Sequence, residues 1–181
     1  LIEQVNPLGK TRLQAYDAVG NMVSEIDANG NRTHTYWNEN DQVILEIDPL
    51  GFATSYIYDP AGNTLSETRH AVSVDEDPDR DDPMASVTLV ADADQTLAFD
   101  HDERNRLQKI TNPLGGERAY DYDRVGNVVS DTDENGNKTT YVYDNNNQLI
   151  QSTSPLGNEL AAAALPGDQQ ATIDDYSKYF E

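Results

Sequence analysis

The residues best suited to chemistry are two short runs in which carboxylate and amide side chains alternate around a glycine. The runs are Asp27, Asn29 and Asn31 around Gly30, and Asp133, Asn135 and Asn137 around Gly136. Alternating oxygen ligands ahead of a turn glycine are typical of the start of a calcium loop. Both runs lack the bidentate glutamate that closes such a loop, so we favour an Asx-type turn between strands. We therefore expect no metal and no cofactor, with calcium as the alternative.

The other reactive side chains show no spacing that predicts catalysis. His34, His70 and His101 lack metal-ligand spacing, and no Gly-x-Ser-x-Gly elbow occurs. Carboxylates are so frequent that no pair stands out as a general acid and base. Trp37 and the tyrosines could form a platform for sugar rings, but periodic aromatic residues on a strand face more often belong to a core. We predict no catalytic residue and no enzyme activity.

The charge balance limits the partners. The 181 residues include 33 Asp and Glu against 12 Lys and Arg, which gives a formal net charge of −21. Such a charge repels phosphate backbones and anionic lipid, so we expect no nucleic acid and no membrane insertion. No stretch approaches the roughly 18 apolar residues of a membrane span, and because no basic n-region precedes an apolar h-region we expect no signal peptide in this sequence. Cysteine is absent, which excludes disulfides and thiolate sites.

The elements that position these side chains come from a repeat of 21 residues. One series of glycines marks a first turn: Gly9, Gly30, Gly51, Gly115, Gly136 and Gly157. A second series, mostly an aromatic residue followed by Asp, marks a second turn: Tyr16, Trp37, Tyr58, His101, Tyr122 and Tyr143. Glycine closes the second turn at Gly20, Gly62 and Gly126, and Asp41 or Asn147 replaces it elsewhere. These residue types tolerate positive φ, so each unit is predicted to be strand, turn, strand, turn.

The strands are clearest in the unit that begins at Asp48. Residues 53–58 and 64–68 are predicted strands, joined by the second turn at residues 59–63. Alternation places Thr54, Tyr56 and Tyr58 on one face. Because most tyrosines share this phase, we predict a core built largely of tyrosine. Tyr36 is one residue out of phase and is expected on the opposite face, and His101 is expected to pack in place of a tyrosine.

The repeat divides the chain into four parts. Residues 1–68 and 94–159 carry regular units, and residues 69–93 are a degenerate unit whose missing second-turn mark falls near Asp79. We expect strands at residues 69–74 and 87–91, separated by an acidic, proline-containing loop at residues 75–83. Residues 160–181 form an Ala-rich, then acidic and aromatic tail, predicted to be a cap or a linker.

The recurring Tyr-Asp-x-x-Gly-Asn and Asp/Asn-Pro-Leu-Gly turns, in phase over about residues 1–159, closely resemble the YD repeat of the RHS-repeat family. This family includes Rhs polymorphic toxins, shell subunits of insecticidal toxin complexes, wall-associated bacterial proteins and teneurins. The resemblance implies successive hairpins in one long sheet that coils into a hollow shell, and a secreted or cell-surface location in a bacterium. Where such a shell encloses a toxin, the toxin and an autoproteolytic core lie beyond the repeats. Asp48-Pro49-Leu50-Gly51 is similar to the family's cleavage region, but it lacks the surrounding Gly-Gly-x-Asn and is interpreted as a turn.

These observations together predict an all-β array of tandem hairpins in a twisted, coiling antiparallel sheet. The predicted function is structural: a scaffold segment of a large secreted or surface protein, building a shell or filament that encloses a toxin or presents a surface. Its partners would be neighbouring repeats of the parent chain, copies of itself, or an enclosed toxin domain. The alternative is an adhesive module that binds carbohydrate or calcium.

Overall fold

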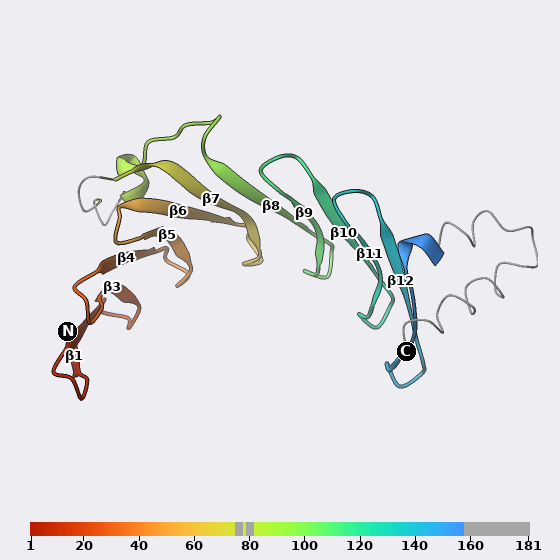
Figure 1. Ribbon diagram of the computed structural model, residues 1–181, viewed down its shortest axis with the longest axis horizontal. Coiled ribbons are helices and arrows are strands. Elements are labelled where there is room, and N and C mark those ends of the chain that lie inside the picture. The colour runs from red at the N-terminus through yellow and green to blue at the C-terminus, as the bar shows by residue number, and fades with distance from the viewer. Residues whose placement is uncertain (75–77, 79–81, 158–181) are drawn as a thin grey trace, which may run out of the picture. The chain divides into compact units, whose positions relative to one another are not determined.

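The computed structural model describes residues 1–74, 78 and 82–157 (Figure 1). The described chain is all-β apart from short helical turns, and its thirteen strands lie in the sheet in the same order as in the sequence. It forms two compact units, Leu1–Ala98 and the residues from Phe99 onward. The acidic segments 75–77 and 79–81 and the tail from residue 158, for which a loop and a cap or linker were predicted, lie outside the described residues.

The first unit contains seven complete strands, a short helical turn and the start of an eighth strand. The strands are β1 (Ile2–Val5), β2 (Thr11–Tyr16), β3 (Met22–Ile26), β4 (Arg32–Trp37), β5 (Val43–Ile47), β6 (Phe52–Tyr58) and β7 (Thr64–Ser73). The helical turn η1 (Pro83–Ser86) precedes β8 (Gln95–His101), which ends in the second unit. The second unit continues with β9 (Leu107–Thr111), β10 (Glu117–Tyr122), β11 (Val128–Thr132), β12 (Lys138–Tyr143) and β13 (Leu149–Thr153).

Within each unit, consecutive strands pair antiparallel through short turns, so the predicted array of tandem hairpins is confirmed. The register shifts by one residue just before the repeat aromatic. In β6, for example, Ile57 pairs with Ser66 but Tyr58 pairs with Thr64, which leaves Leu65 as the extra residue of a β-bulge. The same shift occurs at Tyr16, Trp37, Tyr122 and Tyr143. Bulges increase local twist, and here they recur with the repeat.

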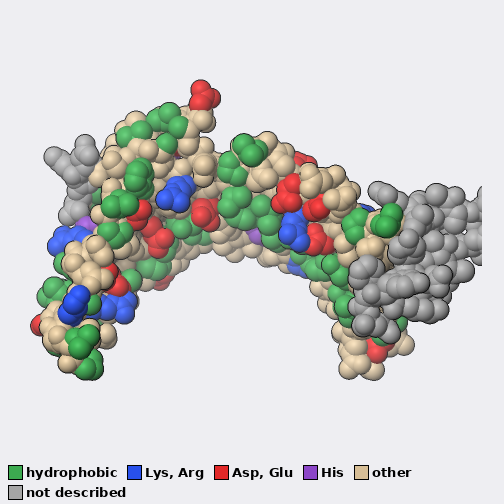
Figure 2. Space-filling view, in the orientation of Figure 1, with side chains coloured by type: hydrophobic (Ala, Val, Ile, Leu, Met, Phe, Trp, Pro, Cys, Tyr) green, Lys and Arg blue, Asp and Glu red, His purple; other side chains and the backbone are tan. Residues whose placement is uncertain are grey.

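The predicted tyrosine core is wrong. The buried hydrophobic residues of the described chain are Leu45, Ile47, Ala53 and Val87, and they form one cluster in the first unit. Ala53 alternates with Tyr56 and Tyr58 along β6, so this cluster lies on the face opposite those tyrosines. The repeat tyrosines stay partly exposed, and the hydroxyls of Tyr58 and Tyr122 bond to backbone carbonyls of the preceding strand. Figure 2 shows hydrophobic side chains lying among charged ones on the visible surface.

Tyr36 lies on the opposite face from the repeat aromatics, as its phase predicts. It packs against the core cluster, and its hydroxyl donates a hydrogen bond of 3.3 Å to the carbonyl oxygen of Pro78. The out-of-phase tyrosine therefore contacts the connection between β7 and β8, in which the interruption of the repeat lies.

The connection between β7 and β8 covers the face that carries the core cluster. Val87 enters that cluster with Val74 beside it, and the Val74 amide donates to the Gly51 carbonyl at 2.8 Å. Gly51 has φ of 86°, and a Cβ there would lie 2.9 Å from the Val74 oxygen, so this approach requires glycine. The strand predicted at residues 69–74 is present as the second half of β7. The strand predicted at residues 87–91 is absent, because Val87 turns into the core and the Val90 amide bonds to the Asp94 side chain.

Gly157 was predicted to close a first turn like the other glycines of its series, and this is also wrong. Residues 155–157 are helical, and the Gly157 amide donates to the Ser154 hydroxyl at 3.3 Å. Serine before proline is a strong helix start, because the hydroxyl accepts an orphan amide and proline fits the first helical position.

Removing the Tyr58 hydroxyl should weaken the hairpin array. Tyr58 donates a 2.8 Å hydrogen bond to the carbonyl oxygen of Val43 on the adjacent strand. We expect Tyr58→Phe to lower the free energy of unfolding in urea by about 1 kcal/mol, since the carbonyl loses its partner. Tyr56→Phe is the matched control, because Tyr56 contacts Glu46 at 3.3 Å and its loss should matter less. Equal effects in both variants would contradict a specific role for the repeat tyrosine.

Candidate functional site

Both predicted turns of the repeat are built in the same way, although their sequences differ. In each, the side-chain Oδ1 of an Asp or Asn accepts hydrogen bonds from the amides two and four residues later. At the first turn, Asp27 accepts from Asn29 and Asn31 at 2.8 and 2.9 Å. At the second turn, Asp59 accepts from Ala61 and Asn63, both at 2.9 Å. We call this Asp or Asn the turn cap.

The turn caps recur through both units. First-turn caps are Asn6, Asp27, Asp48, Asn112 and Asp133, and second-turn caps are Asp17, Asn38, Asp59, Asp102, Asp123 and Asp144. Three residues after each cap, the backbone has positive φ: Gly9, Gly20, Gly30, Asp41, Gly51, Gly62, Asn105, Gly115, Gly126, Gly136 and Asn147. The sequence located these left-handed positions and predicted an Asx-type turn for the runs at Asp27 and Asp133, which is confirmed, but it did not extend this cap to the other turns.

Asp41 and Asn147 do more than replace glycine. Asp41 Oδ1 accepts a 2.8 Å hydrogen bond from the Asn21 side-chain amide in the preceding unit. Asn147 Oδ1 accepts from Asn127 in the same way at 3.2 Å. A left-handed Asp or Asn costs more backbone strain than glycine, but here its side chain links neighbouring second turns.

The repeat aromatic connects each hairpin to the strand before it. The hydroxyls of Tyr58 and Tyr122 donate to the carbonyl oxygens of Val43 and Leu107, at 2.8 and 2.7 Å. The Trp37 indole nitrogen makes the equivalent bond to Met22 at 2.9 Å. The Trp37 indole therefore bonds to the neighbouring strand, and this contact accounts for its position without a sugar ligand. His101, which takes the place of a repeat aromatic, is half-buried with an Nδ1 that has no partner among the described residues.

In both predicted calcium runs, the Asp oxygens are occupied by the turn itself. Besides the two amides, Asp27 Oδ2 accepts from the Asn31 side chain at 2.8 Å, and Asp133 Oδ2 accepts from Asn137 at 2.9 Å. Asn29 Oδ1 accepts from the Lys10 ammonium at 2.9 Å. Among the described residues no group of three or more His, Cys, Asp or Glu is arranged to hold a metal ion. The arrangement seen in both runs is the Asx turn.

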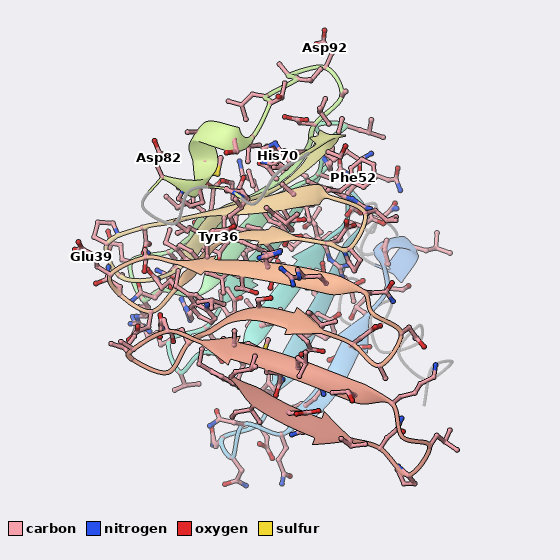
Figure 3. All side chains as sticks on the ribbon, turned by 90° about the vertical axis from the view of Figure 1, so that its left-hand side faces the viewer. Tyr36, Glu39, Phe52, His70, Asp82 and Asp92 are labelled. Carbon is pink, nitrogen blue, oxygen red and sulfur yellow. The ribbon has the colours of Figure 1, made fainter. Side chains whose placement is uncertain are left out.

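The sequence missed a buried polar relay that joins three distant residues. Ser55 Oγ lies 2.8 Å from His70 Nε2, and His70 Nδ1 lies 3.1 Å from Asp94 Oδ2. Asp94 also accepts the Ala71 and Val90 amides at 2.8 and 3.0 Å. Figure 3 shows His70 beside the connection that carries Asp82 and Asp92. The relay thus ties β6, β7 and the end of that connection together.

The pairing of β6 with β7 brings His70 into the relay, and a local register irregularity begins at this residue. Phe52 pairs with Ser73 and Thr54 with Arg69, so three residues of β7 lie opposite Ala53 alone. Because Ser55 pairs with Thr68, alternation along β7 places His70 on the same face as Ser55, where it is 2% exposed. No sequence motif signals the relay, because Ser55, His70 and Asp94 lie on separate elements with no local spacing.

The relay has the donor order of a nucleophile, a base and an orienting acid. An ionised carboxylate only accepts, so Nδ1 carries the proton and Nε2 accepts from the Ser55 hydroxyl. The Ala71 amide, and then the Val90 amide and His70, lower the pKa of Asp94, which keeps it ionised. Ser55, however, is only 9% exposed and pairs across the sheet with Leu45, which is fully buried. A substrate would have to displace the covering connection, so the geometry fits a structural pin.

Comparison with known proteins agrees with this repeat architecture. The model of the family described as RHS Repeat matches residues 1–32 and 122–159. The structure is similar to that of TcdB2-TccC3-Cdc42, with a TM-score of 0.58 and 21% identity over 80% of this chain and 7% of that chain. It is also similar to TcdB2-TccC3 without its hypervariable C-terminal region, with a TM-score of 0.58, 22% identity and the same coverage. The chain thus spans 7% of the length of these solved chains. A comparison with curated proteins gives no match.

The fold and the capped turns define a tandem β-hairpin repeat protein. The two segments matched by the RHS Repeat model carry the same turns as the units between them. Two segments of the chain are similar to the RHS Repeat family, and the described residues form an array of hairpin repeats. No helix among its described residues is long and apolar enough to cross a membrane.

Ser55→Ala should show that the relay pins the connection onto the sheet. The variant removes the Ser55 hydroxyl that bonds to His70 Nε2 and leaves that buried nitrogen without a partner among the described residues. We expect a loss of about 1–3 kcal/mol in the free energy of unfolding, measured in urea. Ser73→Ala, at an exposed serine of β7, is the matched control and should change it little. Stability unchanged by Ser55→Ala would contradict the pin.

The turn caps predict a loss of stability in acid. The Arg106 guanidinium, together with backbone amides, lowers the pKa of Asp102 to about 2, and Asn31 lowers the pKa of Asp27 in the same direction. A carboxylate with a lowered folded-state pKa stabilises the fold above its unfolded pKa, and this contribution is lost as pH falls through the folded value. We therefore expect the urea midpoint to fall between pH about 4 and about 2.

Asp102→Asn tests this at one cap. The variant keeps an Oδ1 acceptor but cannot titrate, so the fall in midpoint toward acid should be shallower than in the parent chain. An equally steep fall in the variant would show that Asp102 does not contribute to the acid sensitivity.

Proposed function

We propose that this segment forms part of the wall of a β-shell in a secreted or surface bacterial protein, and that the shell encloses cargo such as a toxin domain. The observation that carries the proposal is the uniform turn cap. The same hydrogen bonds recur in both units, which supports a role as a repeated wall element. Repeats of this kind build extended surfaces from nearest-neighbour contacts.

The solved relatives support the cargo role by analogy. They include TcdB2-TccC3 together with Cdc42, and TcdB2-TccC3 without its hypervariable C-terminal region. This chain matches 7% of those structures, so it would supply a few turns of wall in a much larger assembly. Its neighbours would be further repeats. All four residues of β1 are exposed at the end of the strand order, and such an edge pairs readily with another strand.

The proposed role is not enzymatic. The Ser55, His70 and Asp94 side chains would hold the connection between β7 and β8 against the wall, and their burial keeps the serine away from substrates. Any proteolytic or toxic activity of the parent protein would then belong to residues outside these repeats.

Electron microscopy of the parent protein tests the proposal, combined with protease treatment. A closed hollow particle, in which the sequence beyond the repeats resists proteolysis until the shell is opened, is the expected result. Open filaments with all flanking sequence equally cleaved would contradict enclosure.

Calorimetry with calcium and a glycan array test the alternative of an adhesive module. Because Asp27 and Asp133 already bond to turn amides, we expect no heat of calcium binding and no glycan signal. If calcium heat is seen, Asp27→Asn is the informative variant, because it keeps the turn acceptor and removes the charge. Heat that disappears in Asp27→Asn would support a calcium-braced module.

A further inference from the structure

The two Asn-Gly pairs of the chain lie in exposed first turns, where the backbone nitrogen of the glycine can react with the asparagine side chain. Asn29 and Asn135 are exposed, and each precedes a glycine that is also exposed. A Cβ at Gly30 or Gly136 would meet nothing within 4 Å, so no neighbour shields the glycine nitrogen. We propose that Asn29 and Asn135 are sites of spontaneous deamidation to aspartate and isoaspartate, and that Asn29 reacts faster.

The reaction needs only the chain and water. The Gly30 backbone nitrogen attacks Cγ of Asn29, a C–N bond forms, and the side-chain amide leaves as ammonia after proton transfer, giving a cyclic succinimide. Water then adds to one of the two carbonyls and opens the ring. Opening on one side gives aspartate, and opening on the other gives isoaspartate, in which the main chain runs through the β-carbon.

The turn itself sets a common barrier at both sites. The Gly30 amide donates to the Asp27 carbonyl at 3.0 Å, and the Gly136 amide donates to the Asp133 carbonyl at 2.9 Å. These hydrogen bonds must open before the nitrogen can attack. Exposed turns open locally at little cost, and because the two turns match in these bonds, Asn135 is an internal reference for Asn29.

The difference between the sites is Lys10. Its ammonium donates to Asn29 Oδ1 at 2.9 Å, across from the preceding first turn. A cation on the amide oxygen draws electrons from Cγ and stabilises the negative charge that develops on this oxygen during attack. Asn135 has no such contact among the described residues. An exposed charge contact of this kind corresponds to about a twofold to fivefold faster reaction, or ~0.4–1 kcal/mol.

Aspartate or isoaspartate at position 29 would change the first turn that Asp27 caps. Deamidation adds a negative charge beside Asp27, and the isoaspartate form lengthens the main chain inside a turn whose cap bonds amides on both sides of the altered residue. The cap could not keep both bonds at their present lengths, so this turn would loosen first as the protein ages.

Peptide mapping by mass spectrometry tests the proposal on the whole chain. The protein is incubated in neutral and mildly alkaline buffer made with ¹⁸O-water, and an isoaspartate-specific methyltransferase reports the isomer. The controls are Lys10→Gln, which keeps a polar side chain without the charge, and a short peptide with the sequence of residues 25–33. We expect ¹⁸O incorporation at both asparagines, faster at higher pH, with Asn29 ahead of Asn135 by about twofold to fivefold. Lys10→Gln should bring the two rates together.

Two results would overturn the proposal. If neither asparagine reacts while the peptide does, the capped turn protects the pair and the sites do not exist in the folded chain. If Lys10→Gln leaves the ratio of the two rates unchanged, the lysine has no part in the difference.

Discussion

The structure depends on one hydrogen-bonding constraint, the turn cap. Five-residue turns leave backbone amides that the strands cannot satisfy, and unsatisfied amides are costly. A single carboxylate or amide oxygen satisfies two of them in every described regular turn, as Asp48 does for Leu50 and Phe52. The left-handed residue then closes the turn. With both devices in each half of the repeat, hairpins follow one another without a large buried core, which explains how a chain with few buried residues and a net charge of −21 can be ordered.

Much of this fold follows from the sequence because local rules set it. The 21-residue phase, the left-handed glycines and the strand pairs all depend on residues close together in the chain, and Tyr36 was placed on the correct face by its phase alone. The core was not predictable in this way. The tyrosine phase indicated which residues share a face but not which face is covered, and the covering segment comes from the one irregular stretch, which contributes Val87.

The same limit applies to the candidate site. The turn caps Asp27 and Asp133 were found as oxygen-rich runs, because their partners are two and four residues away. Ser55, His70 and Asp94 could not be found, because the pairing of β6 with β7 and the path of the β7–β8 connection bring them together. Gly157 shows the opposite case: its phase was regular, but Ser154 and Pro155 favour a helix start and override the repeat.

Amide hydrogen exchange, read residue by residue, tests the turn cap most directly. The amides four residues after each cap lie in or beside turns but should exchange slowly: Lys10, Asn21, Asn31, Gln42, Phe52, Asn63, Arg106, Gly116, Asn127, Asn137 and Gln148. The amides of Ala28 and Glu39, which directly follow a cap and make no such bond, should exchange quickly. Protection that recurs at alternating intervals of 10 and 11 residues is the predicted result. Equal, fast exchange at both sets of amides would contradict the account.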